Sequence, residues 1–144
     1  MTEQKKDAGG VINWPAALDA TGGDEALLVD LLNIFLEESM TLMSQIRQAI
    51  ERQDYVLLNR AGHTLKGGLR IFESSEAIEL ARQLEFMARE LAQDQKDVEK
   101  GSKDASVITP ERIAAAFADA PRVMAELEPQ LERVTAEMKA RLGQ

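Results

Sequence analysis

The chain has 144 residues, of which 44% are hydrophobic and 4% aromatic, and it carries a formal net charge of −8. This length and hydrophobic content predict one domain with its own core, and the acidic balance disfavours general nucleic-acid binding. The chain has no cysteine and a single histidine, which excludes disulfides, thiolate metal sites and multi-histidine zinc sites. No stretch approaches the roughly 18 apolar residues of a membrane span and no signal-peptide pattern is present, so we expect a cytoplasmic protein.

The N-terminal part of the chain is predicted to hold a leader and a short helix. Residues 1–10 are polar and end in two glycines, so we expect a disordered leader. Asn13 is a good N-cap and Pro15 is tolerated in a first helical turn, which predicts a lead helix that ends near Ala20. Trp14 is expected to cover one end of the core rather than to mark a binding surface, because large aromatic side chains usually serve burial.

The next two segments are predicted to form long antiparallel helices. Asp24 starts a segment that runs to about Arg52, with apolar residues at intervals of three and four. These residues are Leu28, Leu32, Phe35, Leu42, Ile46 and Ile50. Met40 and Met43 flank the stripe and are predicted to fill gaps in the core. A tight connection at Gln53–Asp54 then requires the following helix to fold back antiparallel.

This following helix ends near Phe72 and carries the only histidine. At about 100° per residue, its apolar residues fall in one stripe that faces the core. They are Leu58, Ala61, Leu65, Leu69 and Phe72. His63 lies roughly 160° from the centre of that stripe, so its ring is predicted to point to solvent. Gly67, one turn later on the same face, has no side chain that could cover the ring.

Three basic residues surround His63 on this helix, with no acidic residue among them: Arg60, Lys66 and Arg70. A local cationic face on an acidic chain suggests an anionic ligand. Two glycines inside a helix cost about 1 kcal/mol each relative to alanine, which is easier to understand if something must approach the backbone beside His63. The alternative is a solvated helix face on which the histidine and the glycines occur by chance.

The fourth segment is predicted to be another amphipathic helix, capped by Ser74 or Ser75. Its apolar stripe consists of Ala77, Leu80, Ala81, Leu84, Met87, Ala88 and Leu91. From Gln93 to Thr109 the periodicity ends. We therefore predict a mobile charged loop over residues 93–109 without a site of its own, whose first half can extend the preceding helix by about one turn.

The last segment opens at Thr109 and Pro110, a standard helix start, and its apolar residues alternate at fours and threes as far as Met138. Pro121 and Pro129 each remove a backbone hydrogen bond. We therefore predict a helix that is kinked but packs along one continuous apolar stripe, and we expect any true break to fall at Pro121. Taken together, the segments predict an all-α fold over residues 11–144. It is an up-down antiparallel four-helix bundle with a short N-terminal lead helix and a kinked, proline-containing last helix.

The stretch His63-Thr64-Leu65-Lys66-Gly67-Gly68 resembles the signature of the histidine-containing phosphotransfer (HPt) domains of two-component phosphorelays. That signature runs His, any residue, hydrophobic, Lys, Gly, small. The motif alone is moderately specific, and its context strengthens it. The resemblance extends from roughly Ile12 to Arg89, and within that range it includes Asn13–Leu18, Gly23–Glu25, Phe35–Glu38 and Leu84–Glu85. Many members have Asn and then Gly after the motif, where this chain has Ile71 and Glu73. The missing glycine leaves open whether this helix ends in the usual left-handed turn.

The resemblance implies that His63 takes a phosphoryl group from a receiver-domain aspartate and passes it to another receiver, in a response regulator or a hybrid histidine kinase. The receiver would supply the acidic residues and the Mg²⁺, so no cofactor or metal is expected in this chain. A neutral imidazole is a competent nucleophile near pH 7, since its ordinary pKa is about 6.5, and it would hold the phosphoryl group as a phosphoramidate.

Supporting roles are expected for residues around the imidazole. Lys66 and Arg70, together with Arg60, would offset the incoming negative charge, and Gly67 would leave room for the phosphoryl group. Glu85 matches the family position that approaches the ring and would orient it, with a plain solvated glutamate as the alternative. On the same side of the helix, Val56 and Ile71 are read either as part of an apolar docking surface or as ordinary exposed hydrophobes.

The chain has no phosphate-cradling glycine-rich loop and no kinase-like nucleotide motif. We therefore expect a phosphoryl carrier that neither uses ATP nor phosphorylates itself. It should act as a monomer, without nucleic-acid or membrane partners. The alternative function is a non-phosphorylated helical module that binds a receiver domain or another helical partner.

Overall fold

The computed structural model describes residues 10–143, and every regular element within them is helical. In chain order these are α1 (Trp14–Ala20), α2 (Glu25–Arg52), α3 (Tyr55–Phe72), α4 (Ser75–Glu99), the short 3-10 helix η1 (Ala105–Val107), α5 (Pro110–Ala116) and α6 (Ala120–Arg141). The predicted leader lies outside the described residues except for Gly10. Within the described range, no helix has the length and apolar character needed to cross a membrane.

The first three helices begin directly after Asn13, Asp24 and Asp54, where the sequence predicts a cap, a segment start and a tight connection. The side chains of Asn13, Asp24 and Asp54 each accept a hydrogen bond from the backbone N–H three residues later, at 3.0 or 3.1 Å. Such a bond satisfies one of the free N–H groups at a helix start. Ser74 takes the corresponding position before α4, but its side chain makes no cap bond, and its buried hydroxyl has no hydrogen-bond partner among the described residues.

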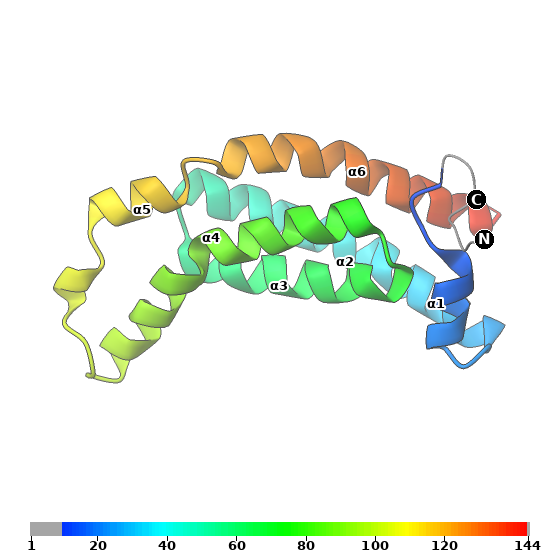
Figure 1. Ribbon diagram of the computed structural model, residues 1–144, viewed down its shortest axis with the longest axis horizontal. Coiled ribbons are helices and arrows are strands. Elements are labelled where there is room, and N and C mark those ends of the chain that lie inside the picture. The colour runs from blue at the N-terminus through cyan, green and yellow to red at the C-terminus, as the bar shows by residue number, and fades with distance from the viewer. Residues whose placement is uncertain (1–9, 144) are drawn as a thin grey trace.

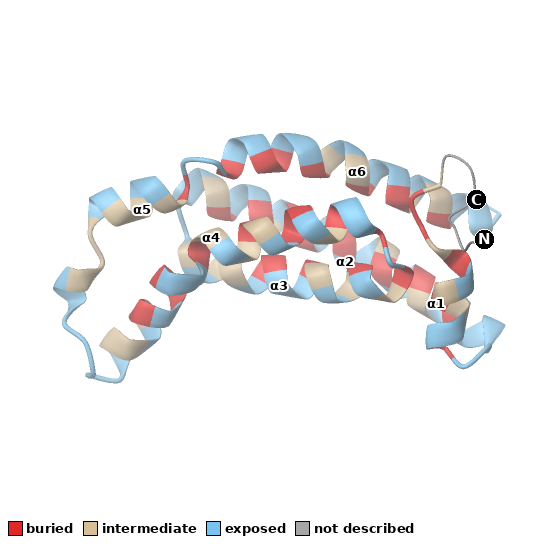
Figure 2. Ribbon diagram, viewed as in Figure 1, coloured by how far each residue is buried: buried red, intermediate tan, exposed pale blue. Residues whose placement is uncertain are grey.

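The long helices lie side by side and reverse direction at each connection (Figure 1). Helix α3 packs against both α2 and α4, and α4 also packs against α6. Helix α1 lies at the end of the assembly where α3 ends, and the backbone N–H of Asn13 donates to the carbonyl of Phe72 at 3.0 Å. Buried residues face the interior between these helices (Figure 2).

The predicted stripes form the core with one exception among the methionines. All five stripe residues of α3 are at most 1% exposed, and Trp14 is also buried. Met43 is buried as predicted, but the prediction for Met40 was wrong, since it is 75% exposed. The stripe of α2 passes instead through Ser39, which is buried and donates its hydroxyl to the carbonyl of Leu36 at 3.2 Å. A serine can occupy such a position because the helix backbone satisfies its hydroxyl.

Helix α4 continues to Glu99, well past Gln93, so the first part of the predicted 93–109 loop is helical. The apolar pattern ends in the sequence because Asp94 occupies a buried position. Its carboxylate accepts hydrogen bonds from Lys103 and Arg112, each at 2.7 Å. These bonds attach the segment that follows α4 to the helix itself, and they could not be predicted from local periodicity.

The predicted last helix is two helices. Helix α5 ends at Ala116 and α6 starts at Ala120, so the break falls just before Pro121, as predicted. Pro121 lies in the first turn of α6, where its missing N–H would have no intrahelical partner in any case. Pro129 lies inside α6 and does not end it.

Candidate functional site

His63 projects from the outer face of α3. Its side chain is 66% exposed, while the neighbouring stripe residues Ala61 and Leu65 are buried. The outward orientation predicted from the helical period is therefore confirmed. An exposed ring on a packed helix is accessible to a partner molecule while its backbone stays fixed.

Glu85 of α4 links His63 to Lys66. One carboxylate oxygen, Oε2, lies 2.7 Å from Nδ1 of His63, and the other, Oε1, lies 2.6 Å from Nζ of Lys66. The Glu85 and Lys66 side chains are only 19% and 13% exposed. Glu85 is thus a partner of the ring rather than a solvated glutamate. Lys66 does not extend freely into solvent, because its ammonium group is held by the carboxylate.

The surroundings of Glu85 keep its carboxylate ionised. Burial alone raises the pKa of Glu85, but hydrogen bonds from Lys66 and His63, together with the positive charge of these groups, outweigh burial and lower the pKa below its ordinary value. A carboxylate that stays charged accepts hydrogen bonds and does not compete for the proton on Nδ1. In the tautomer that donates from Nδ1, the other ring nitrogen, Nε2, keeps its lone pair.

Two residues of α3 allow Glu85 to lie this close to His63 and Lys66. Gly62 faces the α4 backbone, and a Cβ atom placed on it would lie 2.9 Å from the backbone nitrogen of Glu85 and 3.3 Å from the carbonyl oxygen of Ala81. Only glycine lets two helices approach so closely without a shift. The side-chain amide of Asn59 donates to the backbone carbonyl of Glu85 at 3.1 Å, which fixes the position of the α4 backbone against α3.

The two glycines that follow Lys66 have different surroundings. A Cβ on Gly67 would meet no atom within 4 Å, so the space beside it is open to solvent. A Cβ on Gly68 would lie 3.0 Å from the ring of Phe35, so this glycine allows α2 to pack against α3. The open backbone patch predicted beside His63 is therefore Gly67 alone.

Arg60 and Arg70 flank the site on α3 and are both exposed. Within residues 10–143, their guanidinium groups form no ion pair. Val56 is 37% exposed, whereas Ile71 is half-buried and packs against the core. Of the two candidate docking hydrophobes, only Val56 is thus substantially exposed.

Helix α3 ends in a left-handed turn although Glu73 stands where a glycine would favour it. Glu73 has φ 50° and ψ 45°, and its N–H donates to the carbonyl of Arg70 at 3.2 Å. The question left open by the sequence is answered in favour of the left-handed turn, which a non-glycine residue adopts at some conformational cost.

Sequence reasoning missed the roles of Gly62 and Asn59. The available signal was their position, since both lie on the Lys66 side of α3, toward the helix that carries Glu85. The structure brings together His63, Lys66, Gly67 and Glu85 and leaves Arg60 and Arg70 on the rim. Among the described residues, no group of three or more His, Cys, Asp or Glu side chains is placed to hold a metal ion.

The family model described as Hpt domain matches residues 30–137, which is most of the chain and includes the site on α3 and α4. No curated protein and no solved structure gave a match.

Proposed function

The chain belongs to the family of Hpt domains, and from this premise we propose that it is a phosphorelay intermediate. His63 accepts a phosphoryl group from the aspartyl phosphate of a receiver domain and passes it to another receiver domain. Membership in the family implies phosphotransfer in two-component relays; the residue and the direction of transfer are our proposal. The scaffold of this site is an up-down antiparallel four-helix bundle in which α1 is the lead helix.

The observation that carries the proposal is the 2.7 Å contact between Nδ1 of the exposed His63 and the Glu85 carboxylate. It gives the ring one defined orientation and assigns the proton to Nδ1. The nucleophilic lone pair then lies on Nε2. A solvent-exposed histidine without such a partner would rotate freely and would sample both tautomers.

In the forward step, Nε2 attacks the phosphorus of the aspartyl phosphate. The Nε2–P bond forms as the bond between phosphorus and the acyl oxygen breaks, and the aspartate leaves as a carboxylate. The ring becomes positively charged because Nδ1 keeps its proton. Glu85 offsets this charge through its contact with Nδ1. The reverse step transfers the phosphoryl group from Nε2 to the aspartate of the next receiver.

The remaining site residues act around this step. Lys66 holds the Glu85 carboxylate in place through the 2.6 Å contact and contributes positive charge to the site. Arg60 and Arg70 offset the charge of the incoming phosphoryl group at longer range. Gly67 leaves open space beside the ring, which the phosphoryl group and the receiver backbone can enter.

Receiver domains of response regulators or of a hybrid histidine kinase are the proposed partners. In this scheme the receiver supplies the acidic pocket and the Mg²⁺ on which phosphoryl transfer depends, and this chain supplies the nucleophile and its orientation. The chain acts as a phosphoryl carrier without using ATP.

The test is phosphate transfer from a panel of receiver domains charged with acetyl phosphate. We expect label on this chain that is labile to acid and stable to alkali, as a phosphoramidate is. The label should be lost in His63→Gln and kept in Thr64→Ala, a neighbouring exposed position. Label that persists in His63→Gln contradicts the proposal. Binding of a receiver without any label would instead support the non-phosphorylated interaction module.

A further inference from the structure

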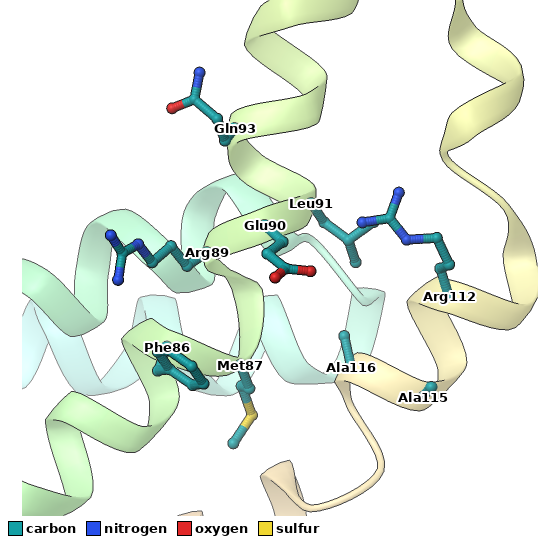
Figure 3. Close-up of a pocket in the computed structure, with 9 residues that line it drawn as sticks. All are labelled: Phe86, Met87, Arg89, Glu90, Leu91, Gln93, Arg112, Ala115 and Ala116. Atoms are coloured by element: carbon teal, nitrogen blue, oxygen red, sulfur yellow. The ribbon is translucent and has the colours of Figure 1, made fainter.

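The exposed face of α4 carries an aromatic side chain one residue after Glu85, the partner of His63. Phe86 follows Glu85 in the chain and is 62% exposed, whereas Leu84 and Ala88 are fully buried. Phe86 lies at the edge of a groove between α4 and α5, with Met87 next to it and Ala115 and Ala116 on the opposite wall (Figure 3). The chain thus leaves most of this ring uncovered although α5 lies close by.

A positive charge accompanies this ring. Arg89, three residues after Phe86, extends away from the α5 wall of the groove (Figure 3). No carboxylate in the described part of the chain pairs with it, whereas Arg82 on the preceding turn is held by both oxygens of Glu79. Among residues 10–143, Arg89 thus forms no ion pair, and the same holds for Arg60 and Arg70 on α3, on a protein of net charge −8. Exposed cations without an ion-pair partner are complementary to an acidic partner.

A partner that binds over His63 with an interface of ordinary size can also cover Phe86. A standard interface buries about 800 Å² on each partner, which corresponds to a disc of roughly 16 Å radius. Glu85 touches His63 at 2.7 Å, and the Cα atoms of consecutive residues are about 3.8 Å apart. Phe86 and Arg89 follow Glu85 by one and four residues and are both exposed, so a footprint centred on the imidazole is large enough to include them.

We propose that Phe86 and Arg89 form the α4 half of the docking surface for the receiver domain that exchanges phosphate with His63. This inference rests on the proposed function. The receiver is the occupant whose acidic phosphoacceptor region matches the charge of the surface. Phe86 acts as the aromatic anchor, as expected for a side chain with large contact area, and Arg89 meets the acidic rim. The chemistry on the ring does not involve either residue.

The experiment uses the full chain and the receiver that labels it fastest in the transfer assay. The receiver is held in its activated form with beryllium fluoride and Mg²⁺, and binding is measured by titration. We expect Phe86→Ala to weaken binding about tenfold or more, and Met40→Ala, which truncates an even more exposed side chain on α2, to change it less than about twofold. Arg89→Glu should slow association, with an effect that decreases as salt is raised.

A second readout separates docking from chemistry. Phosphoramidate, a small phosphoryl donor, needs no protein interface, so it should label His63 at the same rate in the wild-type chain and in Phe86→Ala. Transfer from the receiver at subsaturating concentration should be about tenfold slower in Phe86→Ala. Slower labelling by phosphoramidate would show that Phe86 acts through the site rather than through docking, and would overturn the inference.

Other outcomes would also overturn it while the proposed function stands. These are wild-type binding by Phe86→Ala, an equal loss in Met40→Ala, or a loss confined to Ile34→Ala, which truncates an exposed residue of α2. A change in sedimentation of Phe86→Ala without a change in transfer would assign the ring to self-association. If no receiver labels the wild-type chain, the proposed function fails, and this inference fails with it.

Discussion

Gly62 of α3 and the backbone of Glu85 in α4 are in such close contact that a single added methyl group would lie 2.9 Å from the Glu85 nitrogen. This approach determines where the Glu85 carboxylate lies and hence how the His63 ring is held. The geometry of the site therefore depends on a residue that has no functional group of its own.

Replacing Gly62 by alanine should separate α3 from α4. The methyl group gains about 1 kcal/mol of helix propensity, but overpacking against backbone atoms costs about 1–3 kcal/mol, so we expect a net destabilisation of up to about 2 kcal/mol. Urea unfolding followed by circular dichroism measures the change. The shift of Glu85 should also slow transfer to His63. A Gly62→Ala chain as stable and as active as wild type would show that the helices adjust without consequence.

Gly67→Ala is the matched change and should have the opposite effect on stability. A Cβ at this position meets no atom within 4 Å, so only the helix propensity remains and the free energy of unfolding should rise by about 0.5–1 kcal/mol. Transfer from a receiver should nevertheless become slower, because the methyl group occupies the space beside the ring. The same denaturation and transfer assays measure both effects, and a faster or unchanged transfer rate would argue against a role for this open patch.

Glu85→Gln should lower the free energy of unfolding and should make this free energy less dependent on pH. The pKa of Glu85 is lowered from its ordinary 4.5 in the folded chain, so the carboxylate stabilises the fold above about pH 4.5, and this contribution is lost as the pH falls through the lowered folded-state value. Glutamine cannot accept from both Lys66 and His63 with equal geometry, and we expect a loss of about 1 kcal/mol at pH 7. The difference between the variants, measured by urea unfolding at pH 7 and near pH 3, should shrink at the lower pH. An undiminished difference would mean that the carboxylate charge is not the cause.

Asp94→Asn should loosen the segment that follows α4. The Asp94 carboxylate accepts from Lys103 and Arg112, and the hydrogen bonds from these two groups lower its pKa below the ordinary 3.8. The stabilisation is therefore present above about pH 3.8 and lost as the pH falls further. Hydrogen exchange of residues 100–109 should become several-fold faster in the variant, with the amides of α3 unaffected. Asp97→Asn is the control, because it removes the charge of a 3.6 Å contact to Lys103 while an amide oxygen can still accept from Gln93; equal exchange in both variants would contradict the assigned role.

The elements that the sequence predicted correctly depend on local chemistry. The starts of α1, α2 and α3 were predictable because an Asn or Asp side chain caps the N–H groups three residues later. The outward position of His63 was predictable because an unbroken helical period places it opposite the α3 stripe. The break before Pro121 followed from the backbone hydrogen bond that proline lacks.

The features that escaped prediction depend on contacts between helices. The link between Lys66 and Glu85 requires the α3–α4 distance that Gly62 permits, and no spacing within α3 reveals it. An extension of this helix past Gln93 by about one turn was predicted, but its full course to Glu99 goes with Asp94 being satisfied by side chains further along the chain. Phe86 lies outside the apolar stripe of α4, so its exposure agrees with the helical period, but its position next to the Glu85–His63 contact depends on how α4 packs against α3.

The single tryptophan of the chain is located where it can serve as an optical reporter. Trp14 donates from Nε1 to the carboxylate of Glu137 at 2.8 Å, and the Arg141 guanidinium lies 4.6 Å from the centre of its ring. Both partners belong to the last turns of α6. Intrinsic fluorescence therefore reports whether the end of α6 is docked on α1, without an added label. A receiver bound over His63 could then be examined for long-range effects by following emission from a residue at the α1 end of the bundle.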